Sequence, residues 1–598
     1  MDRNSAIGLT LIAILLLVYF NFLAPTPAPP EASAAQVTTT ESKTDSVQTT
    51  IVAPVDSVLQ AQYGSLSALI TGSEELTTIE NTDLKLSLSN HGLIREVELK
   101  NFKTYQQTPL YLARGNNNRF ALIGQYEGRT VDFYTLYYTP ATSKKGDTTV
   151  ITYTARTGPS AYIQHVYSIP PTGYQIGYAV RTSGVTFPEK NFTYRWQDQI
   201  PLQEKDINDS RAKTTINYYD VNGDFDNLSQ TSTDLETEAL ATPLKWVAIR
   251  QKFFISSILA RNAFAGGDVK TFANVNDTSV VKEATVELFI PTEDVAAGKA
   301  SFRYYFGPND YTILSDVAEG FSRNLDLGWP PMLWINKYVI IPIFNLLEGW
   351  MSNYGLIIVL LVLFVKIILL PLSYSSYLGM AKMRLLKPEL DLIKEKNGEN
   401  MAQNQQDQLK LYQQAGVNPF SGCIPLLLQM PILFAMFYFF PVSIELRQKS
   451  FLWAEDLSTY DSIINLPFTI PFYGSHVSLF VLLMTASTLI YTWQNNQLTS
   501  VQGPMKSMGY IMPVIFMFVL NTFSAGLSFY YFVSNLVTFA QQAIIKRFVD
   551  EDKIVAVMED HKKKMLAGNG TGKKSSFMSK LEQAMKASEE ARKAAKKK

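Results

Sequence analysis

The stretch of sequence that decides the fold runs from residue 355 to residue 372, GLIIVLLVLFVKIILLPL, an apolar run interrupted by one charge, Lys366. A helix of this length reaches roughly 27 Å, which is close to the roughly 30 Å thickness of the hydrocarbon core of a bilayer. We therefore predict that the run spans a membrane.

Lys366 is the unusual residue of this run. An ionisable side chain inside a span costs about 2.5 to 3.5 kcal/mol at mid-bilayer, and such a residue ordinarily marks a functional site that faces protein or water. The alternative is a lysine that snorkels to the headgroups, because the end of the run is only about six residues, or roughly 9 Å, away. The run alone leaves both interpretations open.

Five other apolar runs lie at residues 1–24, 424–440, 477–493, 508–520 and 525–545. The first is longer than the apolar part of a signal peptide, so we expect an uncleaved anchor. Among the short loops and the tail of the membrane half, Lys and Arg are most numerous in residues 373–418, with six, and after residue 545, with fifteen. The positive-inside rule then predicts six spans with both termini in the cytoplasm and the domain after the first span outside it.

That outer domain is predicted to be all-β. Residues 78–324 alternate apolar and polar positions, as at Leu84, Leu86 and Leu88, and turn signals separate the alternating stretches, which is typical of a β-sandwich. The predicted organisation is an anchor (1–24), a flexible linker rich in Pro, Ala, Thr and Ser (25–77), the β-sandwich (78–324), an interfacial amphipathic helix (325–354), the second span (355–372), a cytoplasmic helical hairpin (373–418), spans three to six with an outer loop at 441–476 (419–545), and a basic cytoplasmic tail (546–598).

The sequence offers no catalytic or cofactor motif. Cys423 is the only cysteine and the four histidines are scattered, so a disulfide framework within one chain and a zinc site have no support. Residues 220–231 open like a calcium loop but have Phe225 where glycine is needed, and residues 568–575 lack the first glycine of a phosphate loop. We expect no enzyme activity, no cofactor, no metal and no nucleotide.

Polar residues inside the apolar runs are the remaining signal. Each amide or hydroxyl left unsatisfied in hydrocarbon costs several kcal/mol, so these residues either bond between helices or line a wet cavity. Helix-to-helix bonding suffices for any one of them, but a lysine without an acidic partner on any span favours a shared water-filled cleft. The candidate residues of this cleft are Lys366, Gln429, Tyr530, Tyr531, Ser534 and Asn535.

Several long stretches resemble one protein family. GCIPLLLQMPILFAMFY (422–438), MPVIFMF (512–518) and GLSFYYFVSNLVTFAQQ (526–542) are similar to the YidC family of membrane-protein insertases, and WVAIRQKFFISSIL (246–259) is similar to the periplasmic domain of its Gram-negative members. The resemblance implies five helices around a hydrophilic groove, a periplasmic β-supersandwich, and work with or without the Sec translocon. The groove charge of the family is usually arginine. Lys366 occupies that place and keeps the charge but loses the guanidinium fork.

The expected fold is therefore mixed: a polytopic α-helical membrane protein with six spans and a large all-β periplasmic domain. The expected function is to insert, fold and assemble integral membrane proteins in the inner membrane. The expected partners are nascent membrane proteins, the Sec translocon, the ribosome and membrane lipids, and we expect a monomer. Two alternatives are a secondary transporter, for which we find neither paired half-repeats nor a coupling carboxylate, and a membrane-anchored periplasmic carbohydrate-binding protein.

Overall fold

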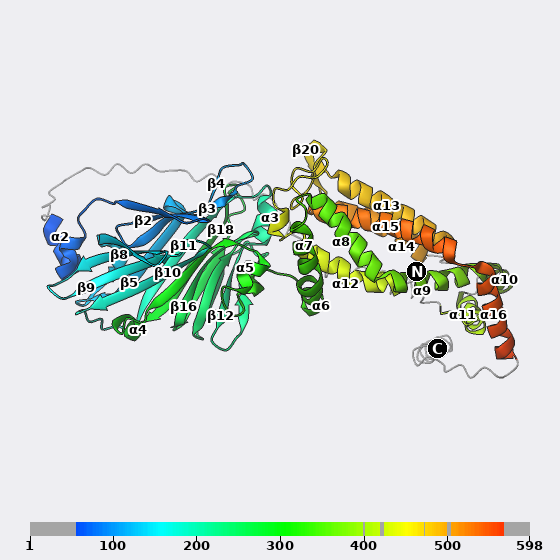
Figure 1. The fold of residues 1–598 in the computed structure, drawn as a ribbon, viewed down its shortest axis with the longest axis horizontal. Helices are drawn as coiled ribbons and strands as arrows, with labels where there is room; N and C mark the ends of the chain where they lie inside the picture. The colour runs from blue at the N-terminus through cyan, green and yellow to red at the C-terminus, as the bar shows by residue number, and fades with distance from the viewer. Residues whose placement is uncertain (1–54, 399–400, 419–423, 472, 499–503, 567–598) are drawn as a thin grey trace, which may run out of the picture. The chain divides into compact units, whose positions relative to one another are not determined.

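The computed structural model describes residues 55–398, 401–418, 424–471, 473–498 and 504–566 (Figure 1). The predicted anchor at 1–24, most of the linker and the end of the tail lie outside these residues. The described chain divides into two compact units. The first takes the chain up to residue 337 with residues 435–461 and 524–526, and the second takes residues 338–434, 462–523 and those from 527.

The first unit is built from antiparallel sheets, so the prediction of an all-β domain is confirmed. Within the described residues it contains a four-stranded sheet (β1-β2-β3-β4), a nine-stranded sheet (β13-β12-β15-β16-β19-β10-β9-β8-β7) and a six-stranded sheet (β14-β17-β18-β11-β5-β6). The strands are β1 Leu76–Glu80, β2 Leu84–Ser89, β3 Leu93–Lys103, β4 Pro109–Arg114, β5 Asn118–Tyr126, β6 Arg129–Asp132, β7 Thr139–Lys145, β8 Thr148–Arg156, β9 Tyr162–Ile169, β10 Gln175–Ser183, β11 Asn191–Pro201, β12 Thr215–Asp220, β13 Phe225–Asn227, β14 Glu236–Leu240, β15 Leu244–Arg250, β16 Phe254–Phe264, β17 Gly267–Phe272, β18 Val280–Pro291 and β19 Ser301–Pro308.

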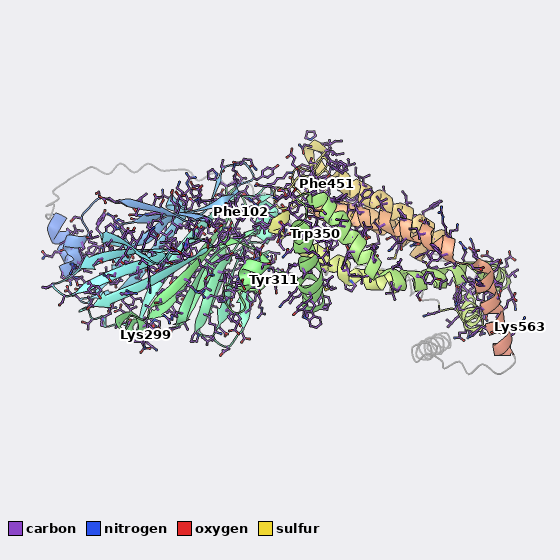
Figure 2. The ribbon with its side chains drawn as sticks, viewed as in Figure 1. Phe102, Lys299, Tyr311, Trp350, Phe451 and Lys563 are labelled. Atoms are coloured by element: carbon purple, nitrogen blue, oxygen red, sulfur yellow. The ribbon has the colours of Figure 1, made fainter. Side chains whose placement is uncertain are left out.

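The alternation in the sequence becomes the burial pattern of these strands. In β11, Tyr194 and Trp196 are buried and lie opposite Leu288 and Val286 of β18. One face of a strand such as β11 therefore supplies large apolar side chains to the core, as period-two patterning requires. Two short helices, α3 Ile207–Ala212 and α4 Thr292–Ala296, connect strands. A third, α5 Tyr311–Ser315, follows the last strand, and its Tyr311 is labelled in Figure 2.

The linker prediction is wrong at its C-terminal end. Residues 55–69 form the helix α2 (Val55–Tyr63) and a 3₁₀ helix (Gly64–Leu69). Leu66 is fully buried, and Arg129 Nε donates to the carbonyl of Ala61 at 2.9 Å. A few apolar residues order this segment because the β-sheets supply the rest of the contact surface, which composition alone does not reveal.

The turn that resembles a calcium loop uses its first carboxylate internally. Asp220 Oδ1 accepts hydrogen bonds from the backbone N–H groups of Asn222 and Asp224, each at 2.9 Å. This is an Asx-type turn.

The second unit is largely helical. Its helices are α7 Ile341–Glu348, α8 Tyr354–Ile368, α9 Leu370–Leu385, α10 Lys387–Asn397, α11 Met401–Gln414, α12 Ile424–Phe439, α13 Leu479–Leu498, α14 Pro504–Leu520, α15 Ala525–Phe548 and α16 Glu551–Leu566. Of α12, only the residues up to 434 belong to this unit. A small sheet pairs β20 Ile464–Ile470 with β21 Gly474–Val477. The single interfacial helix predicted at 325–354 is instead three pieces: α6 Pro330–Ile335, a π-helical segment Asn336–Ile340 and α7. Pro342 lies in the first turn of α7 and has no N–H to continue the preceding helix.

The run 355–372 is not one straight helix, which corrects the prediction of a continuous span. α8 ends at Ile368, α9 begins at Leu370, and the two are bent by 63°. Pro371, in the first turn of α9, cannot donate to α8 and its ring clashes with the preceding turn. By length and composition, only this bent pair passes as a candidate span among the described residues, and no single helix does. Gln429–Phe439 and Ser507–Leu520 are apolar but shorter.

The hairpin predicted at 373–418 packs on part of the predicted tail. Met383 and Leu390 from the hairpin are buried in one cluster with Ile554 and Met558 of α16. Residues 551–566 of the tail are thus an ordered helix, on which Lys563 is labelled in Figure 2.

Candidate functional site

Lys366 lies in the last turn of α8 and its side chain points into the helical unit. The residue is 5% exposed. Its ammonium Nζ donates to Gln429 Oε1 of α12 at 3.1 Å and to Thr538 Oγ1 of α15 at 2.9 Å. Three helices that are far apart in the sequence therefore meet around one cation.

The partners of Lys366 are themselves connected. Gln429 Nε2 donates to Ser534 Oγ at 3.2 Å, and Thr538 Oγ1 also donates to the carbonyl of Ser534 at 2.7 Å. Gln541 Nε2 donates to the backbone carbonyl of Lys366 at 3.0 Å. We call these five residues, Lys366, Gln429, Ser534, Thr538 and Gln541, the lysine cluster.

Two members of the lysine cluster were missing from the candidates chosen on sequence. Thr538 and Gln541 follow Ser534 by four and seven positions, so all three share one face of α15. That spacing was available in the sequence. The pairing with Lys366 was not, because it depends on how α8 and α15 pack.

Asn535 belongs to a different group. Its Nδ2 donates to Ser487 Oγ at 2.9 Å and to Thr488 Oγ1 at 3.0 Å, both on α13. One residue along a helix turns the side chain by about 100°, so Asn535 bonds α15 to α13 while Ser534 faces the lysine cluster. The structure thus places Asn535 in helix-to-helix bonding.

The two tyrosines of the candidate set lie on the preceding turn of α15. Tyr530 is 3% exposed and precedes Ser534 by one helical turn, whereas Tyr531 is half-buried. Tyr530 therefore shares the face of Ser534, and Tyr531 lies on the neighbouring face with Asn535.

The chemistry of the lysine cluster suits binding. An ammonium has three N–H donors, and two of them go to uncharged oxygens. No carboxylate of the described residues lies within ion-pair distance of Lys366, whereas other buried cations such as Lys252 and Arg447 pair with Asp209 and Glu204. A polar or acidic group that reached the cluster would replace neutral acceptors and would not have to break an ion pair.

Comparison with known proteins identifies the family. The family described as "60Kd inner membrane protein" matches residues 346–552, and the one described as "YidC periplasmic domain" matches residues 76–341. The "Membrane protein insertase YidC" of Amoebophilus asiaticus is 45% identical over 597 residues, which cover 98% of this chain and 99% of that protein. The protein of the same name from Cytophaga hutchinsonii is 45% identical over 619 residues, covering 99% and 98%.

A solved structure, "Active YidC insertase crystal structure with the first transmembrane domain resolved", is 19% identical with a TM-score of 0.33 and covers 81% of this chain and 99% of that chain. The chain belongs to the YidC family of membrane protein insertases.

Proposed function

We propose that this protein inserts, folds and assembles integral membrane proteins in the inner membrane, without a catalytic centre. The observation that carries the proposal is the buried Lys366, held by neutral side chains at the meeting point of α8, α12 and α15. Membership of the insertase family favours this function over the two alternatives from the sequence, a transporter and a carbohydrate-binding protein.

The proposed mechanism lowers the cost of moving a polar segment. Each Leu, Ile, Phe or Val of an incoming span contributes only about 0.3 to 0.6 kcal/mol of insertion free energy, whereas a charged residue at mid-bilayer costs about 2.5 to 3.5 kcal/mol. The hydrophilic flank of the incoming protein enters a groove at the lysine cluster, where the ammonium of Lys366 and the nearby amide and hydroxyl groups replace water. Its apolar segment meanwhile passes into lipid beside α12 and α15.

The proposed topology has six spans, both termini in the cytoplasm, and the β-sheet unit in the periplasm. The charge counts of the loops support it. Exposed apolar side chains such as Ile490 and Trp493 of α13 and Ile511 of α14, each more than half exposed, are then the surface that lipid covers. The hairpin at 373–418 and the tail would meet the nascent chain or the ribosome, and the Sec translocon would act with the protein on some clients.

The test replaces Lys366 with Ala and with Arg and follows insertion of several single-span substrates into proteoliposomes. We expect K366A to lower insertion several-fold for substrates with polar or acidic translocated flanks, because the flank loses its cation. K366R should keep most activity, because it keeps the charge. K145A is the control, since Lys145 is an exposed lysine of β7 and belongs neither to the lysine cluster, nor to the hairpin at 373–418, nor to the tail.

Full activity of K366A with every substrate would refute the role of the lysine cluster. Solute flux through the same liposomes would instead indicate a transporter.

A further inference from the structure

The second unit carries a small sheet that exposes apolar side chains. β20 and β21 pair through Ile464 with Val477 and through Asn465 with His476. In the described residues no third strand joins them, so both edges are open. A two-stranded hairpin is only marginally stable in water and normally needs another surface to support it. We call residues 463–471 and 473–477 the β20–β21 hairpin.

One support of the β20–β21 hairpin is the turn between α14 and α15. Asn521 is fully buried there, and its Nδ2 donates to the carbonyls of Tyr473 at 2.9 Å and His476 at 2.8 Å. Its Oδ1 accepts from the backbone N–H of Ser478 at 3.0 Å. These hydrogen bonds fix the hairpin at this end of the helices, and Figure 1 shows it beside the start of α13.

The rest of the hairpin is open and apolar. Ile463 is 42% exposed, Ile464 54% and Phe468 60%. In β20 the apolar Ile464, Leu466, Phe468 and Ile470 alternate with Asn465, Pro467 and Thr469. Clustered large apolar side chains at such exposure mark a surface that something covers.

Charge favours lipid as the cover. The sequence from 462 to 505 contains no Asp, Glu, Lys or Arg. The apolar surface also reaches α14, because the ring of Tyr473 lies 5.3 Å from that of Phe518, which is 37% exposed. Phe516, on another face of α14, is 49% exposed. Under the proposed function α14 is a span, so this surface faces lipid.

Proline argues against a partner strand. Pro467 lies within β20 and Pro471 directly follows it. Neither has an N–H to give to an added strand, and proline is a common means of blocking edge-to-edge pairing. Lipid makes no such demand on the backbone.

We infer that the β20–β21 hairpin lies at the membrane–water interface on the periplasmic side of the inner membrane, with Ile464 and Phe468 against the acyl chains. There it holds the turn between α14 and α15 at a fixed depth. The inference rests on the proposed function, which places α14 in the membrane. Uncharged apolar residues with aromatic rings are suited to the boundary between headgroups and acyl chains.

The experiment uses the full-length protein in phosphatidylethanolamine–phosphatidylglycerol liposomes, with Cys423 replaced by Ser. The environment-sensitive fluorophore NBD is attached, one position at a time, to the variants I464C, F468C, T469C, F516C and K553C. Lipids with a doxyl group high on the acyl chain quench from the membrane, and iodide quenches from water. We expect lipid quenching at 464 and 468 to be at least twofold stronger than at 469, and iodide quenching to be strongest at 553.

Quenching at position 516 distinguishes failure of the inference from failure of the proposed function. Lipid quenching at 516 together with iodide quenching at 464 and 468 would overturn the inference while leaving the proposed function intact. Protection of 464 and 468 from both quenchers would also overturn it, because protein would then cover the hairpin. Absence of lipid quenching at 516 would overturn both the inference and the membrane placement on which it rests.

Discussion

Lys366 and Asp198 are both buried without an ion-pair partner among the described residues, but their surroundings differ. Two uncharged side chains accept hydrogen bonds from Lys366. Asp198, on β11, is 2% exposed, and neither of its oxygens makes a hydrogen bond of good geometry with the described residues. Burial raises the pKa of Asp198 to about 8, against a smaller opposing effect of Asn118. The first residue is therefore suited to bind a ligand, and the second carries a stability cost when charged.

A change of Asp198 to Asn should remove a pH dependence of stability. The folded protein keeps the proton of Asp198 up to about pH 8, whereas an unfolded aspartate loses it near pH 4. Stability from this group is therefore complete below about pH 4 and falls by about 1.4 kcal/mol per pH unit up to about pH 8. Urea unfolding of the full-length protein in detergent, followed by circular dichroism at pH 5, 6, 7 and 8, should show a shallower decline for D198N.

D268N on β17 is the control for that measurement, because Asp268 is only half-buried. Parallel pH profiles for D198N and the unsubstituted protein would contradict the assignment.

The sequence identified part of the lysine cluster for a physical reason. Lys366, Gln429 and Ser534 are polar in apolar surroundings, and such residues need partners or water. Asn535 met the same criterion but serves another helix pair, because pattern does not reveal which helices pack together. Partner choice depends on tertiary contacts that a single sequence does not contain.

At the scale of elements, the hydropathy of the sequence does not predict the bend between α8 and α9. The run 355–372 stays apolar through Pro371, so its length fits a span although its backbone turns by 63°. Period-two alternation predicted the β-sheets, because strands such as β11 and β18 bury one face and expose the other. Low apolar content concealed the helix at 55–63, whose order comes from contacts made elsewhere in the chain.

The docking of α16 should depend on its apolar face more than on its ion pair. Ile554 and Met558 are 7% and 6% exposed, in the apolar cluster that α16 forms with the hairpin at 373–418. The pair of Lys562 with Glu389, at 2.6 Å and 2.8 Å, is 30% and 45% exposed, and such a pair contributes about 0 to 1 kcal/mol. Truncating a buried Ile or Met to Ala costs about 2 to 5 kcal/mol.

We therefore expect I554A/M558A to accelerate amide exchange in α16 at least tenfold, and K562A to change it less than fivefold. Hydrogen–deuterium exchange of the full-length protein measures both, with K553A as the exposed control. A larger effect of K562A than of I554A/M558A would show that charge, and not the apolar face, holds the helix.

At the scale of the whole molecule, the β-sheet unit is assembled from distant parts of the chain. It includes residues 435–461, and the sequence pattern of residues 78–324 does not predict that this later segment joins the unit. Arg447 Nε donates to Glu204 at 2.9 Å and 3.1 Å, and the two side chains are 3% and 11% exposed. Arg447 also donates to the carbonyl of Lys103 at 2.6 Å. These contacts join residues more than two hundred positions apart, beyond the reach of local sequence signals.

Breaking this buried pair from one side should be costly and should depend on pH. Burial raises the pKa of Glu204 although Arg447 opposes the shift. R447A leaves the carboxylate buried and unpaired, which costs about 3 to 5 kcal/mol when it is charged. Without the arginine the folded pKa of Glu204 rises further, so stability is lost as pH increases through that higher value. The loss of stability in R447A should therefore be greater at pH 8 than at pH 5. Adding E204Q to R447A should restore part of the stability at pH 8.

Urea unfolding at both pH values measures the effect, with K449A as the exposed control. An equal loss at pH 5 and pH 8 would mean that the packing of Arg447, and not the charge of Glu204, sets the contribution of Arg447 to stability.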